Sequence, residues 1–123
     1  PASFLQVKFA AFRHITNDIR VLYRLFRTDT VVQETPYELF PGFDNMTDTT
    51  GDGFGDQVID SKLNNGKPDR FVPASRSEDD FRDYQFTASN LPEFNGFEIK
   101  VIMTGTNQAY APRLRDFRAI AFA

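Results

Sequence analysis

The most chemically suggestive feature of the sequence is a ladder of aspartates in a glycine-rich stretch. Carboxylate oxygens between sharply turning glycines are the donors that Ca²⁺ prefers, because the ion takes roughly six to eight hard oxygen ligands. The ladder repeats at every fourth position: Asp44, Asp48, Asp52, Asp56 and Asp60. The sequence therefore offers a candidate calcium site inside a long Gly/Asp-rich loop, residues 41–68.

Part of the ladder resembles the opening of an EF-hand-type loop. Residues 48–53 (DTTGDG) place acids at the first and fifth loop positions and glycine at the sixth. The pattern then departs, because Thr50 is third and Ile59 is twelfth, where a bidentate glutamate belongs. The alternative is a solvated loop in which Asp, Asn and Gly supply turns, and these departures favour it.

Aromatic residues in the predicted loops could stack on sugar rings. A glycan site needs exposed aromatic platforms beside polar groups. The candidates are Tyr37, Phe43, Phe54 and Tyr110. They define the alternative function, a carbohydrate-binding β-sandwich module with a structural calcium site.

Arginines recur at alternate positions in two predicted strands. Such rows can bind phosphates or carboxylates, but they can equally pair with acids on neighbouring strands. The basic residues are Arg20, Arg24, Arg27, Arg113, Arg115 and Arg118, and the acids are Asp80, Asp83, Glu98 and Asp116. Because the chain carries a formal net charge of −3, we expect cross-strand pairing.

Catalytic groups are scarce in the sequence. The one histidine, His14, falls in a predicted turn, there is no cysteine, and no serine has a nucleophile-like setting. The run 51–55 (GDGFG) lacks the following helix that would make it a phosphate-binding loop. The 17 acidic residues allow many carboxylate pairs, but nothing singles one out. We therefore predict a protein that is not an enzyme.

Composition narrows the choice of partners. The acidic balance gives no general attraction to nucleic acid. No apolar run approaches the roughly 20 residues of a membrane span, so we expect no membrane insertion. Fourteen phenylalanines suit the dry layer between two packed sheets.

Two-residue alternation of apolar side chains predicts strands over most of the chain. Residues 4–13 and 19–27 both alternate, and we expect them to form an antiparallel pair across the polar turn at 14–18. Further strands are predicted at 30–33, 37–40, 70–72, 80–88, 97–104 and 113–122. This pattern indicates one all-β domain over residues 1–123, an antiparallel β-sandwich of jelly-roll-like topology with about seven to eight strands.

Four segments in order resemble a known group of proteins. They are residues 19–25 (IRVLYRL), 40–45 (FPGFDN), 95–101 (NGFEIKV) and 112–121 (PRLRDFRAIA). Together they resemble the C-terminal region of virion structural proteins of contractile-tailed bacteriophages, notably those that infect marine cyanobacteria. The likeness spans most of the chain, and its last segment is the most specific.

The resemblance implies a tail, baseplate or fibre component. It would be assembled in the cytoplasm of the bacterial host. In the virion it would form a homo-oligomer and contact other virion proteins, and it could also bind a host surface glycan. It also implies that the chain is the C-terminal piece of a longer polypeptide, and it carries over no catalytic residue. In the last predicted strand Ala119, Ala121 and Ala123 present little bulk, so another chain could lie against it, or the strand could be central in its own sandwich.

Overall fold

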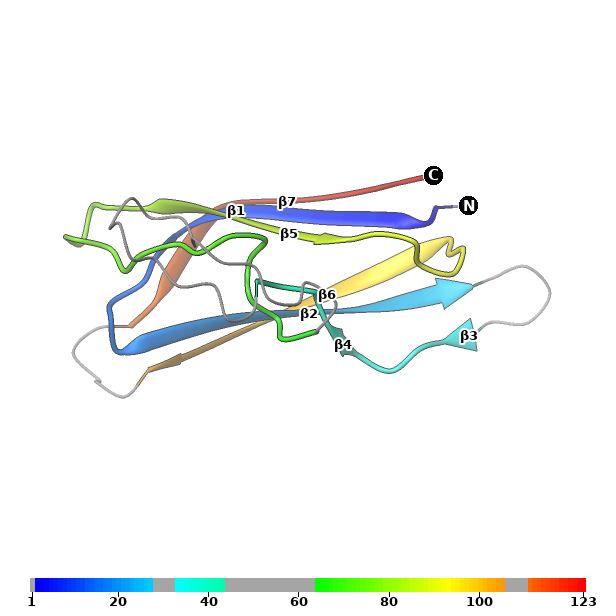
Figure 1. Cartoon of the computed structure of the whole chain (residues 1–123), viewed down its shortest axis with the longest axis horizontal. Coiled ribbons are helices and arrows are strands. Elements are labelled where there is room, and N and C mark those ends of the chain that lie inside the picture. Colours follow the sequence, from blue (N-terminus) through cyan, green and yellow to red (C-terminus); the bar gives the residue numbers. More distant parts are fainter. Residues whose placement is uncertain (1, 28–32, 44–63, 106–110) are drawn as a thin grey trace.

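The chain folds as two layers of β-sheet. The structure is a computed structural model, and it describes residues 2–27, 33–43, 64–105 and 111–123. Within these residues there are seven strands and no helix, and every strand pairing is antiparallel. Figure 1 shows one sheet lying above the other along the length of the molecule.

Each sheet is built around one long central strand. In the first sheet β1 (Phe4–Phe12) lies between β5 (Arg82–Ala88) and β7 (Arg113–Phe122). In the second sheet β2 (Asn17–Arg27) pairs along most of its length with β6 (Gly96–Gly105). Two short strands, β3 (Gln33–Glu34) and β4 (Glu38–Leu39), pair with β2 one after the other on its remaining edge.

The number of strand positions is lower than the sequence predicted. Because β3 and β4 share one edge, the described part of each sheet is three strands wide, which gives six positions instead of seven to eight. The predicted strand at 70–72 is wrong, since these residues form an irregular segment. The strand predicted at 113–122 is confirmed at both ends.

The core lies between β1 and β2, where inward side chains alternate as predicted. The strands of the first sheet contribute Leu5, Val7, Phe9, Ala11, Tyr84, Phe86 and Ala88, and β2 contributes Ile19, Val21, Tyr23 and Leu25, all buried. The Phe9 ring stacks against Tyr84 at 5.6 Å and against Phe86 at 5.4 Å between ring centroids. Burying these apolar faces is the dominant favourable term for such a fold.

The predicted pairing of residues 4–13 with 19–27 is wrong. β1 pairs with β5 and β7, whereas β2 pairs with β6, β3 and β4, so the two strands belong to different sheets. The turn between them carries the chain across the core, with the Asn17 amide donating to the His14 carbonyl at 2.8 Å. The physical reason is that both strands have a largely apolar inner face, and each face needs an opposing layer.

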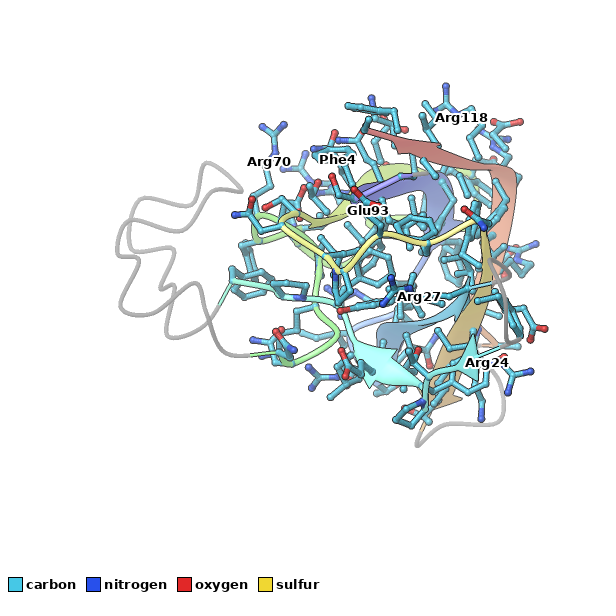
Figure 2. The ribbon with its side chains drawn as sticks, turned by 90° about the vertical axis from the view of Figure 1, so that its right-hand side faces the viewer. Phe4, Arg24, Arg27, Arg70, Glu93 and Arg118 are labelled. Carbon is cyan, nitrogen blue, oxygen red and sulfur yellow. The ribbon has the colours of Figure 1, made fainter. Side chains whose placement is uncertain are left out.

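One long side of the sandwich is closed by residues 64–73. The Asp69 amide donates to the Gln85 carbonyl at 2.7 Å, which covers the outer edge of β5. On the other sheet, the Val21 amide donates to Gly66 at 2.9 Å, and the Gly66 amide donates to Phe40 at 2.9 Å. Figure 2 shows this segment in green on one side of the molecule, with β6 and β7 on the opposite side.

Candidate functional site

The aspartate ladder lies outside the described residues, and calcium binding therefore stays a prediction. Only the base of the long loop is described. There the Phe43 amide donates to the Pro68 carbonyl at 3.1 Å, and Pro41 and Asn64 form a bridge. Among the residues that the structure describes, no group of three or more His, Cys, Asp or Glu side chains could hold a metal ion.

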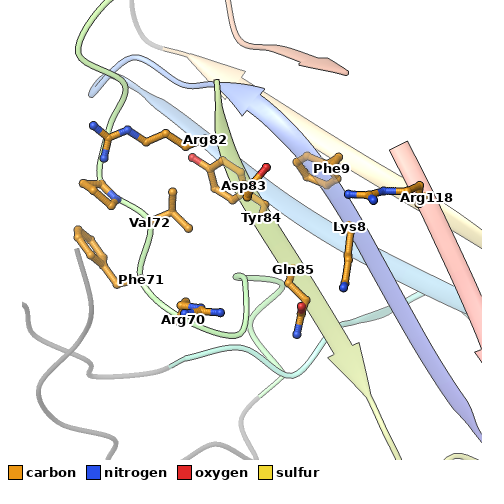
Figure 3. A pocket seen from close by; sticks show the side chains of 11 residues that line it. Lys8, Phe9, Arg70, Phe71, Val72, Arg82, Asp83, Tyr84, Gln85 and Arg118 are labelled. Atoms are coloured by element: carbon orange, nitrogen blue, oxygen red, sulfur yellow. The ribbon is translucent and has the colours of Figure 1, made fainter. Parts of the chain in front are cut away.

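A hollow on the outer face of the first sheet gathers cationic side chains. It has a volume of about 530 Å³ and lies beside residues 70–73, as the close-up in Figure 3 shows. Its lining includes four cationic residues, Lys8, Arg70, Arg82 and Arg118, and one acidic residue, Asp83. Sequence reasoning missed Lys8, Arg70 and Arg82. Lys8 becomes a neighbour of Arg118 only through the pairing of β1 with β7.

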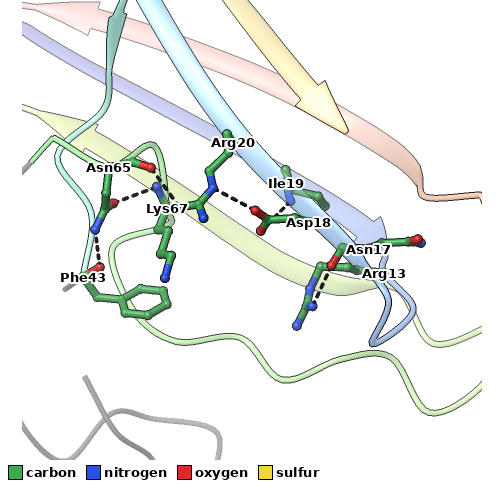
Figure 4. Close-up of polar contacts among 8 residues, drawn as sticks. All are labelled: Arg13, Asn17, Asp18, Ile19, Arg20, Phe43, Asn65 and Lys67. Carbon is green, nitrogen blue, oxygen red and sulfur yellow. Dashed lines mark hydrogen bonds and ion pairs between the residues drawn. The ribbon is translucent and has the colours of Figure 1, made fainter. Parts of the chain in front are cut away.

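Phe43 lies in a second, smaller hollow at the base of the long loop. Its ring meets Phe71 edge-on at 6.1 Å, and the Lys67 ammonium lies 5.2 Å from its centroid. Asn65 fixes the backbone here, since its Nδ2 donates to the Phe43 carbonyl and its Oδ1 accepts from the Lys67 amide at 2.9 Å (Figure 4). The hollow measures about 160 Å³, and Asp18 also lines it.

Tyr37 belongs to a different cluster, on the outer face of the second sheet. Its hydroxyl donates to Glu98 Oε2 at 2.9 Å, and the same oxygen accepts from Arg24 Nη2 at 2.9 Å. The Arg24 guanidinium and the Lys100 ammonium lie 4.8 Å and 5.4 Å from the centre of the ring. The cluster ties Tyr37 to β2 and β6.

The structure therefore does not bring the predicted glycan residues together. Tyr37 packs over the outer face of the second sheet, whereas Phe43 packs against the segment at 65–71. Phe54 and Tyr110 lie outside the described residues. A glycan role for this set stays a prediction.

His14 is a turn residue, in keeping with the polar sequence around it. Its Nδ1 lies 2.8 Å from Thr16 Oγ1 and accepts from the Thr16 amide at 3.2 Å. Its carbonyl closes the same turn by accepting from Asn17. These contacts give the ring a local structural role.

Of the six arginines expected to pair across strands, only Arg24 does so among the described residues, whereas Arg20 and Arg115 pair with acids of their own strands. Arg24 forms a cross-strand ion pair with Glu98 at 2.9 Å. Arg115 lies 3.8 Å from Asp116, and its guanidinium is 4.1 Å from the centre of the Phe81 ring. Arg27, Arg113 and Arg118 form no ion pair among the described residues.

The side of the sandwich formed by β6 and β7 carries most of the exposed apolar surface. Six large apolar side chains are exposed among the described residues, and five belong to these two strands: Ile102, Met103, Phe117, Ile120 and Phe122. Neither strand has a described neighbour on its outer edge. A hollow of about 610 Å³ joins the two strands where Phe97 and Ala121 approach each other.

Comparison with known proteins adds no relative. No family, no curated protein and no solved structure matches the chain. No helix in the described part of the chain is long and apolar enough to cross a membrane.

Proposed function

We propose that this chain is a structural domain of a bacteriophage virion, in the tail, baseplate or fibre, held there by contacts along β6 and β7. The virion assignment depends on the resemblance of four segments to tail-associated proteins, as set out above. The assembly role depends on the concentration of exposed apolar side chains on two unpaired edge strands. Exposed apolar side chains beside free strand edges are typical of a protein-binding surface.

The two halves of β7 differ in how well they resist edge pairing. The first half carries Arg113, Arg115 and Arg118, and a bulge sets Asp116 and Phe117 opposite Phe9 alone. Charged side chains and bulges are the devices by which proteins prevent edge strands from pairing. The second half, residues 119–123 (AIAFA), has neither, so we place the contact there.

Backbone geometry sets the register of such a contact. The Phe122 carbonyl accepts from the Ser3 amide at 3.1 Å and therefore faces β1. Because backbone groups alternate sides along a strand, those of Ala119 and Ala121 face the free edge.

A second copy of the chain is the partner that this edge fits best. A two-fold axis at Ile120 sets Ala119 opposite Ala121 of the partner subunit in an antiparallel ladder. It also sets the Arg118 guanidinium beside the ring of Phe122 of the partner subunit, which is a favourable cation–π arrangement. An axis at Arg118 would oppose two guanidinium groups and is disfavoured. The proposed assembly is thus a two-fold homo-oligomer that joins two first sheets edge to edge.

The oligomer is tested by light scattering coupled to size exclusion. The wild-type protein is expected to have twice the mass of one chain, which is 14.1 kDa. Ile120→Lys, which places two ammonium groups opposite each other at the axis, is expected to have the mass of one chain. Ala121→Pro, which removes an amide that only the partner uses, should act alike. Ile15→Lys, at an apolar residue that is 77% exposed elsewhere, is the matched control. A wild-type monomer at all concentrations would refute the assembly role, and so would equal dissociation by the control.

The virion assignment needs a separate experiment. Mass spectrometry of purified phage particles should detect this chain, and gold-labelled antibodies against it should mark the tail. Absence from the particles would refute the assignment even if the oligomer exists. We also propose that the strands of this sandwich follow a jelly-roll-like topology, as the sequence predicted.

Host attachment through a surface glycan is the second candidate function. It is favoured by the hollow at Phe43, where an aromatic ring lies beside Asp18, Lys67 and Arg13. This combination of a ring with several polar groups is typical of sugar sites. A glycan array with wild-type and Phe43→Ala protein tests it, and equal binding by both would exclude this hollow.

A further inference from the structure

Strand pairing places two positive charges side by side on the outer face of the first sheet. Lys8 on β1 lies directly opposite Arg118 on β7, and on its other side it lies opposite Gln85 on β5. Like charges at directly opposite positions destabilise a sheet. A sheet that contains such a pair gains stability when an anion binds between the two cations.

The two cations are not neutralised within the described part of the chain. The side chains of Lys8 and Arg118 form no ion pair, hydrogen bond or ring contact there. Their neighbours on β7 are engaged, since Arg115 lies over Phe81 and Arg113 donates to the Glu78 carbonyl at 3.2 Å. Lys8 and Arg118 therefore remain available to a ligand.

The pair lines a hollow that is large enough for a small molecule. Its volume of about 530 Å³ falls in the usual range for ligand sites, roughly 300–1,000 Å³. Arg70 and Arg82 also line the hollow, and both have other partners, which for Arg82 is Asp80 at 2.9 Å. In Figure 3 Arg70, Gln85, Lys8 and Arg118 follow one another across the view of the hollow. This positive concentration contrasts with the net charge of −3 of the whole chain.

The remaining lining groups suit a sugar. Gln85 is held in place by donating from Nε2 to Asp69 Oδ2 at 2.9 Å, which leaves its amide oxygen to accept from a hydroxyl. Asp83 offers a carboxylate to further hydroxyls, and Phe71 offers an aromatic ring to the apolar face of a pyranose. Phe71 also lines the hollow at Phe43, so the two hollows share a wall.

We infer that this hollow binds an acidic saccharide, with its carboxylate or sulfate between Lys8 and Arg118. The inference depends on the attachment role for its class of ligand, but not on the residues predicted from the sequence for glycan binding. It shares Arg118 with the proposed assembly, in which that guanidinium also lies beside Phe122 of the partner subunit. Charge-assisted hydrogen bonds from Lys and Arg supply the affinity for the acid group.

Isothermal titration of the full chain tests the site, with a chelator present so that calcium does not contribute. The probes are tetragalacturonate, its neutral methyl ester, a sulfated galactan tetrasaccharide and inorganic phosphate. We expect both acidic saccharides to bind at least about tenfold more tightly than the ester, because each lost charged contact weakens binding by about that factor. The sulfated and carboxylated probes together identify which acid group fits better.

Two double variants separate a site from general attraction. Lys8→Gln with Arg118→Gln should lower affinity for the acidic probes at least about tenfold and leave the ester unaffected. Lys100→Gln with Arg27→Gln makes the same change of charge on the second sheet, away from the hollow, and should have little effect. An equal loss in both variants would overturn the inference.

The outcomes also distinguish this inference from the attachment role. Equal binding of acid and ester would overturn the anion contact while supporting a glycan role. Phosphate binding as tightly as the saccharides would overturn the saccharide assignment. Failure of every saccharide to bind would refute both the inference and attachment at this hollow.

Discussion

Replacing Phe40 with alanine tests how the sandwich is closed. Phe40 follows β4 and belongs to neither sheet, yet its side chain is fully buried. Its ring meets Tyr23 edge-on at 4.9 Å and Phe86 edge-on at 6.1 Å, so it contacts both layers. Its backbone is held through the Phe40 amide, which donates to Val21, and the Phe40 carbonyl, which accepts from Gly66.

The size of the effect follows from this burial. Truncating a fully buried Phe to Ala lowers the free energy of unfolding by about 3–5 kcal/mol. The two edge-on ring contacts, at about 0.5–1.5 kcal/mol each, place Phe40 toward the upper part of that range. A domain of this kind is stable by only about 5–15 kcal/mol, so Phe40→Ala is expected to remove a large share. Phe40→Leu keeps most of the apolar volume and should lose about 1–2 kcal/mol.

Urea unfolding followed by far-ultraviolet circular dichroism measures these changes. Phe43→Ala is the matched control, because it removes the same ring at a half-buried position outside the core and should lower stability by about 1 kcal/mol. If Phe40→Ala were no more damaging than Phe43→Ala, the packing of Phe40 between the sheets would be wrong. The Leu variant keeps the test valid if the Ala variant fails to fold.

Three further predictions use other parts of the molecule. Gly66 has a φ of 73°, and a Cβ there would lie 2.6 Å from Leu39 Cδ2. Gly66→Ala should therefore lower the free energy of unfolding, measured by urea titration, by about 1–3 kcal/mol. Gly96→Ala is the control and should change it much less, because its Cβ would meet nothing nearer than 3.6 Å. Burial raises the pKa of Tyr84, and burial together with a hydrogen bond to Glu38 raises the pKa of Tyr23. The stability that these two neutral phenols contribute should be fully present below the ordinary phenol pKa of 10.0 and be lost as pH rises above it. Absorbance at 295 nm measures their ionisation, and ionisation at the ordinary pKa in the native protein would contradict this prediction. Calcium bound by the aspartate ladder would raise the melting temperature, and an unchanged midpoint on adding a chelator would exclude it.

The sequence predicted which side of β1 and which side of β2 is buried. Leu5, Val7 and Phe9 alternate with polar residues, and so do Ile19 and Val21, because one face of each strand must leave water. This pattern depends on the strand itself and not on its neighbour. For the same reason the bounds of β7 could be predicted correctly from alternation and from Pro112 at its start.

The partners of the strands could not be predicted in the same way. Residues close in sequence form hairpins in many proteins, but here β1 and β2 separate into opposite sheets, and the neighbours of β1 lie far along the chain. Alternation indicates on which face of the sheet a side chain lies, but it does not indicate which strand pairs with the strand that carries it. The candidate anion site depends on that missing information, since Lys8 and Arg118 become neighbours only through the register of β1 with β7.

The same strand takes part in both proposals, and Arg118 is the residue that they share. The hollow extends from Arg118 across β1 and β5 to the segment at 70–73. A second copy paired at residues 119–123 would extend the sheet from the opposite edge of β7, away from β5. The hollow would then stay open, and a two-fold axis at Ile120 would place two such hollows on one continuous sheet. An oligomer of this form would present two anion sites to a repetitive surface polymer, and the avidity from two linked sites can exceed the affinity of either by roughly 10²–10⁴. Ala121→Pro, which removes the partner contact without adding a charge beside Arg118, should therefore leave the affinity for a short acidic saccharide nearly unchanged and weaken binding to a long acidic polymer. If it weakened both equally, the edge and the hollow could not be separate sites.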